Sequence, residues 1–260
     1  MPVEFHAPLL RRARELDLTV LTSVYDPRDV DFCEKLGFPA YKVASFELVH
    51  LPLLRLLAQT AKPVILSTGM ASLGEVEEAL DTLQEAGCDQ VVLLQCCSSY
   101  PAAPASVNLA AMETLRIAFG CPVGFSDHTV GSHVACAAVA LGACFLEKHY
   151  TSDPGRPGPD HRFSIGPEEL RAMVGLIRDV EHSIGTGRKK TEAEEEVNKS
   201  AGRRSLIAVR PIPEGETIAA DAVRILRPGS GLHPRYLDIV LGRTARRHIA
   251  AGQPVTWDDV

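Results

Sequence analysis

Two histidines stand at the ends of two short apolar segments that are one strand–helix–strand repeat apart. His128 comes shortly after the apolar residues 122–125, and His149 shortly after 143–147. Residues 130–141 between them are rich in Ala and Val with helical spacing, which predicts strand, helix, strand. Parallel strands end at one edge of a sheet, where ligands bind, so the two imidazoles are expected side by side. With nearby carboxylates they suit a divalent transition metal that keeps open positions. The alternative is that one or both only make hydrogen bonds at the strand ends.

Lysine and serine side chains stand at the ends of other apolar segments. Lys42 and Ser45 lie around one predicted strand exit, Ser67 ends the next strand, and Ser126 precedes His128. An ammonium group with hydroxyls and backbone N–H groups at strand-to-helix turns suits a phosphate or a carboxylate. Each residue alone could equally be a turn serine or a solvated lysine. Together they favour an anion pocket.

Carboxylates and thiols near these positions have more than one interpretation. Glu47 and Asp127 could be general acids or bases, or could orient Lys42 and a metal-bound histidine. We take Glu47, Asp127 and His128 as the candidate catalytic residues. We expect Cys96 and Cys97 to have a structural role, because no histidine near them in the sequence stands at a position that would indicate an activated thiol.

The segments that position these side chains are continuously apolar, and each is followed by a helical segment. This pattern is typical of parallel strands covered on both faces, in either a doubly wound sheet or a (β/α)8 barrel. Polar residues at many strand exits favour the barrel, where all these exits face one mouth. A Gly/Pro-rich loop at 153–160 resembles an active-site cover. The expected strands are 18–24, 39–45, 63–67, 90–95, 122–125 and 143–147, and the expected helices are 7–16, 27–36, 51–58, 72–86, 109–118, 130–141 and 167–184.

The pattern changes near residue 186. Residues 187–202 are charged and contain almost no large apolar residues, which indicates a linker or an exposed helix. Residues 203–260 contain short β-rich runs separated by Pro/Gly turns, which indicates a small turn-rich domain. We therefore divide the chain into a domain at 1–186, a linker and a second domain.

The composition is that of a globular protein, with 45% apolar and 23% charged residues among 260. The net charge of -6 argues against a nucleic-acid binder, although it does not exclude an anionic small substrate. No segment has the length and apolarity of a membrane span, and residues 1–20 lack a signal-peptide pattern. Seven cysteines without a CxxC pair favour reduced thiols. We expect a cytoplasmic protein that binds neither nucleic acid nor membranes.

Six motifs occur in the order found in the sialic acid synthases, and the chain resembles that family. The motifs are YKVASFE (41–47), KPVILSTGM (62–70), LLQCCSSYPA (93–102), GFSDHTVG (124–131), EKHYT (147–151) and PGPDH (157–161). The tail, 203–216 and 226–232, resembles the family's antifreeze-like SAF domain. The resemblance implies a (β/α)8 barrel plus a small β-rich domain. It also implies condensation of phosphoenolpyruvate with an N-acyl amino sugar, such as N-acetylmannosamine or its 6-phosphate, to a nine-carbon 2-keto acid and phosphate.

The resemblance also implies roles for single residues. His128 and His149 match ligands of Mn²⁺ or Mg²⁺. Arg227 matches an arginine that reaches the active site of a second subunit, which implies a domain-swapped homodimer. Glu47 matches a catalytic carboxylate. The remaining matches are Lys42, Ser45, Ser67, Ser126 and, more weakly, Ser98 for phosphoenolpyruvate, and Tyr100 and Asp160 for the amino sugar.

Two features depart from the family pattern. Gln95 stands where relatives usually have histidine, and the chain begins where the family's third barrel unit begins, so six βα units are visible. A parallel barrel without two neighbouring strands has two open edges, and we expect a truncated or misassigned start. Two further hypotheses stay open: a non-catalytic sugar- or partner-binding remnant, and a metal-dependent barrel aldolase that acts on an unphosphorylated keto acid.

Overall fold

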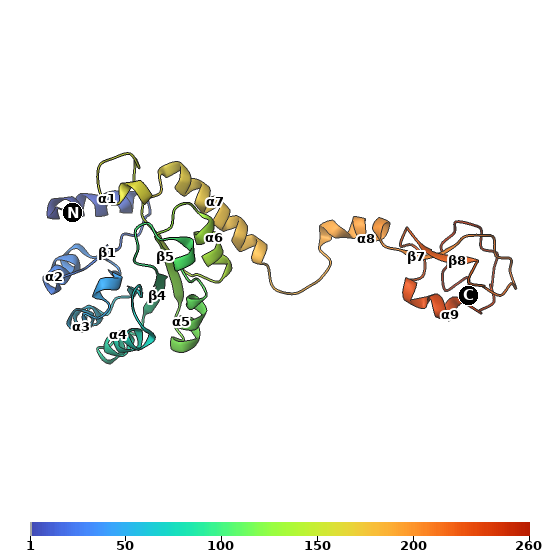
Figure 1. Cartoon of the computed structure of the whole chain (residues 1–260), viewed down its shortest axis with the longest axis horizontal. Coiled ribbons are helices and arrows are strands. Elements are labelled where there is room, and N and C mark those ends of the chain that lie inside the picture. Colours follow the sequence, from blue (N-terminus) through green and yellow to red (C-terminus); the bar gives the residue numbers. More distant parts are fainter. Residues whose placement is uncertain (1) are drawn as a thin grey trace. The chain divides into compact units, whose positions relative to one another are not determined.

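Six parallel strands, neighbouring one another in chain order, form the sheet of the N-terminal unit (Figure 1). The computed structural model describes residues 2–260, and this unit extends to Thr186. Because the order never reverses, the sheet has no switch point of the doubly wound type. The sheet curls and the helices lie around its outer side, so the prediction of six barrel-type βα units is confirmed. The strands are β1 (Thr22–Ser23), β2 (Tyr41–Val43), β3 (Val64–Ser67), β4 (Val91–Cys96), β5 (Val123–Asp127) and β6 (Leu146–Lys148).

Two helices of this unit begin at capping residues that the sequence indicated. At the start of α4, the Ser72 hydroxyl accepts from the backbone N–H of Glu75, and the Glu75 carboxylate accepts from that of Ser72, as the predicted capping box requires. At the start of α2, Asp26 accepts from the N–H of Arg28 at 2.8 Å. The helices of this unit are α1 (His6–Glu15), α2 (Pro27–Leu36), α3 (Leu51–Ala58), α4 (Leu73–Glu85), α5 (Ala111–Phe119), α6 (His133–Ala140) and α7 (Pro167–Ile184).

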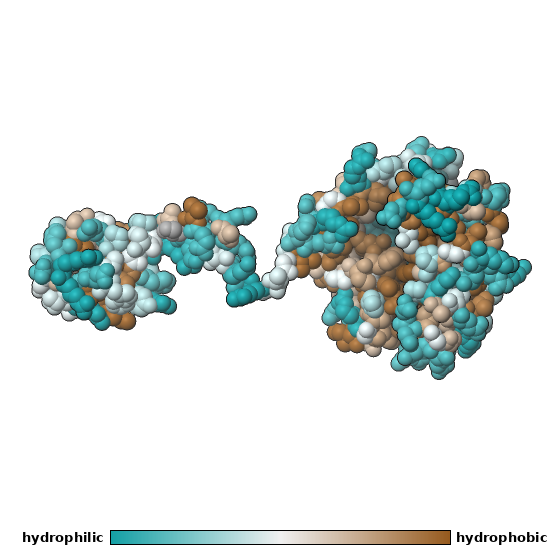
Figure 2. Space-filling view, turned by 180° about the vertical axis from the view of Figure 1, so that it is seen from behind, coloured by the Kyte–Doolittle hydropathy of each residue, from teal (hydrophilic) through white to brown (hydrophobic). Residues whose placement is uncertain are grey.

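The two outermost strands differ from their predicted extents. β1 covers only two residues of the predicted strand 18–24. β6 begins three residues after the start of the predicted strand 143–147. Within the described residues each of them pairs with only one neighbouring strand, which leaves fewer backbone hydrogen bonds to define them. Figure 2 shows apolar residues gathered at the centre of this unit's surface.

The main core lies between the sheet and the helices α1 to α6. Leu53, Leu54 and Leu57 of α3 are completely buried against it, together with Leu66 and Leu93 of the sheet. Burying side chains of this size contributes roughly 1.5–3 kcal/mol each. The buried strands therefore have a rigid framework on which the polar groups at their ends are held.

The C-terminal unit, Gly187–Val260, has its own core. It contains α8 (Glu196–Gly202), α9 (Leu237–Val240) and the antiparallel pair β7 (Ser205–Ala208) and β8 (Val223–Leu226). Outside these two strands, Thr217 makes an isolated bridge to Thr244. None of the helices described between residues 2 and 260 is long and apolar enough to cross a membrane.

Candidate active site

A cavity of about 420 Å³ lies at the carboxyl ends of the strands of the N-terminal unit. Its position is the one expected for a ligand site in a parallel α/β sheet. Eight of the predicted site residues line it, and residues that were not predicted complete the lining. The predicted residues are Lys42, Ser45, Ser67, Tyr100, Ser126, His128, His149 and Asp160, and the others include Ser23, Tyr25, Cys96 and Glu147.

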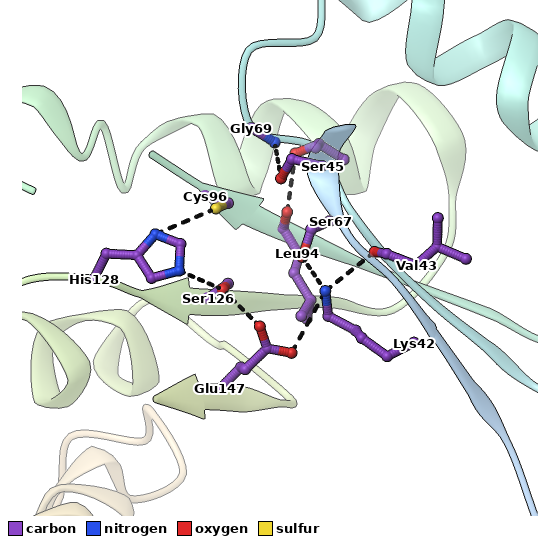
Figure 3. A network of polar contacts seen from close by, with 11 residues as sticks. Lys42, Val43, Ser45, Ser67, Gly69, Leu94, Cys96, Ser126, His128 and Glu147 are labelled. Atoms are coloured by element: carbon purple, nitrogen blue, oxygen red, sulfur yellow. Dashed lines mark hydrogen bonds and ion pairs between the residues drawn. The ribbon is translucent and has the colours of Figure 1, made fainter. Parts of the chain in front are cut away.

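Lys42 brings a buried cation to the cavity, with a residue exposure of 8% (Figure 3). Its Nζ donates to Ser67 Oγ at 2.7 Å and to the Val43 carbonyl at 3.1 Å. The Ser45 hydroxyl is positioned from the next strand exit, since its Oγ accepts from Gly69 N at 3.0 Å. One ammonium and two hydroxyls are thus held at neighbouring strand ends, an arrangement that suits a phosphate or a carboxylate.

Glu147 is a site residue that our sequence interpretation missed. Its Oε2 lies 3.5 Å from Lys42 Nζ, and its Oε1 accepts from Ser126 Oγ at 3.0 Å (Figure 3). Ser126 and Glu147 are direct partners in the β5–β6 register. The signal was present in the sequence, because residues two apart in a strand face the same side. Glu147 precedes His149 by two positions, as Ser126 precedes His128.

His128 is held in one orientation by its backbone surroundings. Its Nδ1 lies 2.8 Å from the Cys97 carbonyl oxygen, which can only accept, so Nδ1 carries the proton and donates it. Nε2 then has the free lone pair and lies 3.5 Å from Ser126 Oγ. Burial lowers the pKa of His128, but its contacts with Cys96 and the Cys97 carbonyl and the charge of Glu147 raise it more, so the pKa lies above its ordinary value.

His149 faces His128 across the cavity, as the sequence predicted. The two ring centroids are 5.3 Å apart, and the Tyr100 ring packs 4.2 Å from that of His128. His149 Nδ1 lies 3.8 Å from an Asp160 carboxylate oxygen. Burial and the nearby His128 lower the pKa of His149, against the opposing effect of Asp160, so its imidazole favours the neutral form.

The two imidazoles carry the donor chemistry that a divalent metal needs. A histidine that donates through one nitrogen to a backbone carbonyl and offers the other is the usual arrangement of a metal ligand, and His128 has it. In residues 2–260, no three His, Cys, Asp or Glu side chains are grouped to hold an ion. His128 and His149 offer imidazole nitrogens to an ion, and the metal itself stays a prediction.

Cys96 contacts this site although the sequence favoured a structural role. It lines the cavity, and its Sγ lies 3.8 Å from His128 Nδ1. Burial raises the pKa of the thiol, but its contacts with His128, Ser45 and Ser126 lower it more, so the pKa lies below its ordinary value. The Nδ1 proton of His128 is directed at the Cys97 carbonyl, which makes the sulfur contact the weaker of the two.

Four predicted site residues do not line the cavity. Asp127 is buried and paired with Lys148 at 2.7 Å, on the other side of the strand from His128. Glu47 Oε2 and Ser98 Oγ are buried without a hydrogen-bond partner among the described residues, and burial raises the pKa of Glu47. Arg227 is exposed in the C-terminal unit. The catalytic and binding roles of these residues, and the homodimer, stay predictions.

The curled parallel sheet defines an α/β protein of the barrel class, with cationic, hydroxyl and imidazole groups gathered at the carboxyl ends of its strands. A model of the NeuB family matches residues 1–189, and a model of the SAF domain matches residues 203–260. The chain belongs to the NeuB family and carries a SAF domain, which confirms the resemblance to the sialic acid synthases.

Two relatives and a solved structure agree with this assignment. The chain is 39% identical to an N,N'-diacetyllegionaminic acid synthase of Campylobacter jejuni, over 95% of this chain and 75% of that protein. It is 38% identical to an enzyme of the same name from Legionella pneumophila, over 99% of this chain and 73% of that one. The crystal structure of the spore coat polysaccharide biosynthesis protein SpsE of Bacillus subtilis superposes with a TM-score of 0.69 at 37% identity, covering 100% of this chain and 78% of that one.

Proposed function

We propose that the protein is a nonulosonate synthase that condenses phosphoenolpyruvate with an N-acyl amino sugar. The observation that carries this proposal is the cavity itself, in which Lys42 and its serine partners lie beside two facing imidazoles. In the overall reaction C3 of phosphoenolpyruvate forms a bond to the sugar aldehyde carbon. Water adds at C2, the C2–O bond to phosphate breaks, and a nine-carbon 2-keto acid and phosphate are released.

Lys42, Ser45 and Ser67 are the groups that bind the phosphate and carboxylate of phosphoenolpyruvate. The ammonium is already held by Ser67 at 2.7 Å, so little side-chain entropy is lost when an anion binds. Glu147 lies within reach of both Lys42 and Ser126. Its carboxylate is available to accept the proton that water loses on adding at C2.

The divalent ion, Mn²⁺ or Mg²⁺, is proposed to be held by His128 and His149. When bound there, it supplies Lewis-acid polarisation of the sugar carbonyl. His128 is suited to this role because its Nδ1 proton is engaged by the Cys97 carbonyl, which leaves Nε2 free. His149 is suited because burial and the nearby His128 lower its pKa, which favours the neutral imidazole that binds a metal.

The sugar is proposed to bind on the side of the cavity formed by Tyr100 and Asp160. Tyr100 presents an aromatic ring, and the Asp160 carboxylate is a hydrogen-bond acceptor for sugar hydroxyls. The names of the relatives suggest a hexose with two acetylated amines, and N-acetylmannosamine is the alternative. A synthase that uses the diacetamido sugar should show a higher kcat/KM for it than for N-acetylmannosamine.

The test is phosphate release from phosphoenolpyruvate with each sugar and Mn²⁺, together with mass spectrometry of the product. The protein should release phosphate and form a nine-carbon acid, and His128→Ala should lower kcat/KM at least 100-fold. His133→Ala, which changes an exposed histidine of α6, is the matched control and should retain activity. If the folded protein releases no phosphate with either sugar, this chain is not a synthase of this kind.

A further inference from the structure

A buried ion pair joins the ends of β5 and β6 on the side of the sheet opposite to the cavity. Asp127 and Lys148 are direct partners in the strand register, with Nζ 2.7 Å from Oδ2. Their side chains are 1% and 7% exposed. Because successive side chains of a strand face opposite sides, each member of this pair directly precedes a cavity histidine but faces away from it. Lys148 in fact lines a separate, mostly apolar cavity beside α6 and α7.

The pair also holds the residue that follows His128. Asp127 Oδ1 accepts from both the backbone N–H and the hydroxyl of Thr129, each at 2.8 Å. Lys148 Nζ donates to the Thr129 carbonyl at 2.6 Å. The two neighbours of His128 in the chain are therefore both tied to β6, and the backbone of His128 has little freedom to move relative to His149.

A buried ion pair of this kind contributes little net stability, because desolvation of the two charges offsets their attraction. Its clearest effect is on register. A shift of β6 by one residue would move Lys148 to the cavity side, and Asp127 would be left buried without a cation. Such a shift would also move His149 away from His128. The native pairing is thus the one arrangement that satisfies both charges and brings the two rings to 5.3 Å.

We propose that Asp127 and Lys148 are positioning residues that fix the spacing of His128 and His149 for metal binding. For the metal, this inference rests on the proposed function. A role for Asp127 as a catalytic acid or base does not agree with its contacts. The carboxylate is buried, both of its oxygens are engaged, and it does not line the cavity.

The test compares three variants with the wild type. Asp127→Asn combined with Lys148→Met removes both charges and is expected to fold, because a neutral pair avoids an unpaired buried charge. Lys62→Met removes a lysine–carboxylate pair with Glu34, 2.5 Å in length, and is the matched control. Thr129→Val keeps the ion pair and removes one hydroxyl that Asp127 accepts from.

Two readouts are measured on each variant. The first is the nuclear Overhauser effect between the His128 and His149 rings in the metal-free protein, and the second is the Kd for Mn²⁺ by calorimetry. In the double variant, the nuclear Overhauser effect between the two rings should disappear. Its Kd for Mn²⁺ should rise at least tenfold, as happens when groups that orient metal ligands are lost. Lys62→Met should change neither. Thr129→Val should raise the Kd about threefold, and it provides the test if the neutral pair does not fold.

The proposal is overturned if the double variant folds and keeps both the nuclear Overhauser effect between the rings and a Kd for Mn²⁺ within twofold of wild type. If the double variant does not fold, the same result for Thr129→Val overturns it. Failure of the proposed function gives a different result. In that case the wild type itself binds no Mn²⁺ and releases no phosphate. The ring–ring effect needs neither metal nor turnover, so the positioning role is then decided by that effect alone.

Discussion

At the scale of single residues, the cavity differs from an ordinary polar cleft in how its charges are distributed. Lys42 and Glu147 face each other at 3.5 Å, and each is also held by a serine, Ser67 and Ser126 respectively. The side chain of Lys42 is 10% exposed and that of Glu147 is 36% exposed. The carboxylate can therefore turn toward water, whereas the buried ammonium can gain most from a bound anion.

Replacing Lys42 tests whether the buried ammonium is the group that gains most from a bound anion. Lys42→Met should keep the fold, because the aliphatic stem remains, and should raise the KM for phosphoenolpyruvate with a loss in kcat/KM of about 100-fold. That loss corresponds to about 2.7 kcal/mol, within the range for a hydrogen bond to a charged group. The measurement is steady-state kinetics with calorimetric titration of phosphoenolpyruvate and pyruvate. Lys35→Met, an exposed lysine of α2, is the control. Unchanged binding of phosphoenolpyruvate would remove Lys42 from the anion site.

At the scale of elements, the backbone of the turn after β3 lies closer to neighbouring side chains than a residue with a Cβ would permit. A Cβ added at Gly69 would lie 2.4 Å from Ser98 Oγ, 2.8 Å from Ser45 Oγ and 3.2 Å from Cys96 Sγ. These contacts are with side-chain ends that can rotate, and not with backbone. Glycine at this position therefore serves the geometry of the site more than the stability of the barrel.

Gly69→Ala should consequently reduce function more than stability. The methyl group must displace the Ser45 hydroxyl, to which Gly69 N donates at 3.0 Å, so the KM for phosphoenolpyruvate should rise at least tenfold. The melting temperature should fall by only a few degrees. Gly74→Ala is a matched control, because a Cβ there meets nothing within 4 Å and alanine favours the helix. A KM equal to that of Gly74→Ala would contradict the role given to this turn.

The sequence predicted the central strands better than the outermost ones. The predicted strands 63–67 and 90–95 agree with β3 and β4 to within one residue at each end. In contrast, only Thr22 and Ser23 of the predicted strand 18–24 pair, because β1 has one neighbour. Pairing across a sheet is a tertiary property, and the apolar pattern of a single segment does not contain it.

The arrangement of the site also depends on strand pairing, which the pattern of a single segment does not contain. His128 and His149 were placed side by side correctly because their spacing is one βα repeat. The sequence did not separate Asp127 from the cavity, because a strand-end carboxylate can face either side until the register is known. The register pairs Asp127 with Lys148 and Ser126 with Glu147, and only this pairing shows which carboxylate faces the cavity.

At the scale of the whole molecule, the chain consists of two units with separate hydrophobic cores. The division after Thr186 lies close to the end of the NeuB match at residue 189. The SAF match begins at residue 203, beside the first strand of the second unit. Each unit therefore has buried residues of its own that determine its stability.

Asp259 is such a determinant in the small unit. It is 4% exposed, and its carboxylate accepts from the Arg247 guanidinium and from the Thr256 N–H and hydroxyl at 2.6 and 2.7 Å. Burial raises the pKa of Asp259, but these donors lower it more, so the pKa lies below its ordinary value. The ionised carboxylate thus favours the folded state. Its contribution is fully present above the ordinary pKa of about 4 and is lost as the pH falls through the lower folded value.

Asp259→Asn should therefore destabilise the small unit at pH 7 by about 2 kcal/mol. For a domain of this size, that corresponds to a melting temperature lower by about 10 °C. The difference from wild type should shrink as the pH is lowered below about 4, since the wild-type carboxylate is then protonated as well.

Trp257, the one tryptophan of the chain, lies two residues away, so its fluorescence reports the unfolding of this unit. Asp258→Asn changes the exposed neighbouring carboxylate and should have little effect at any pH. A difference between wild type and Asp259→Asn that stays constant from pH 7 to pH 2 would show that the charge of Asp259 does not stabilise the unit.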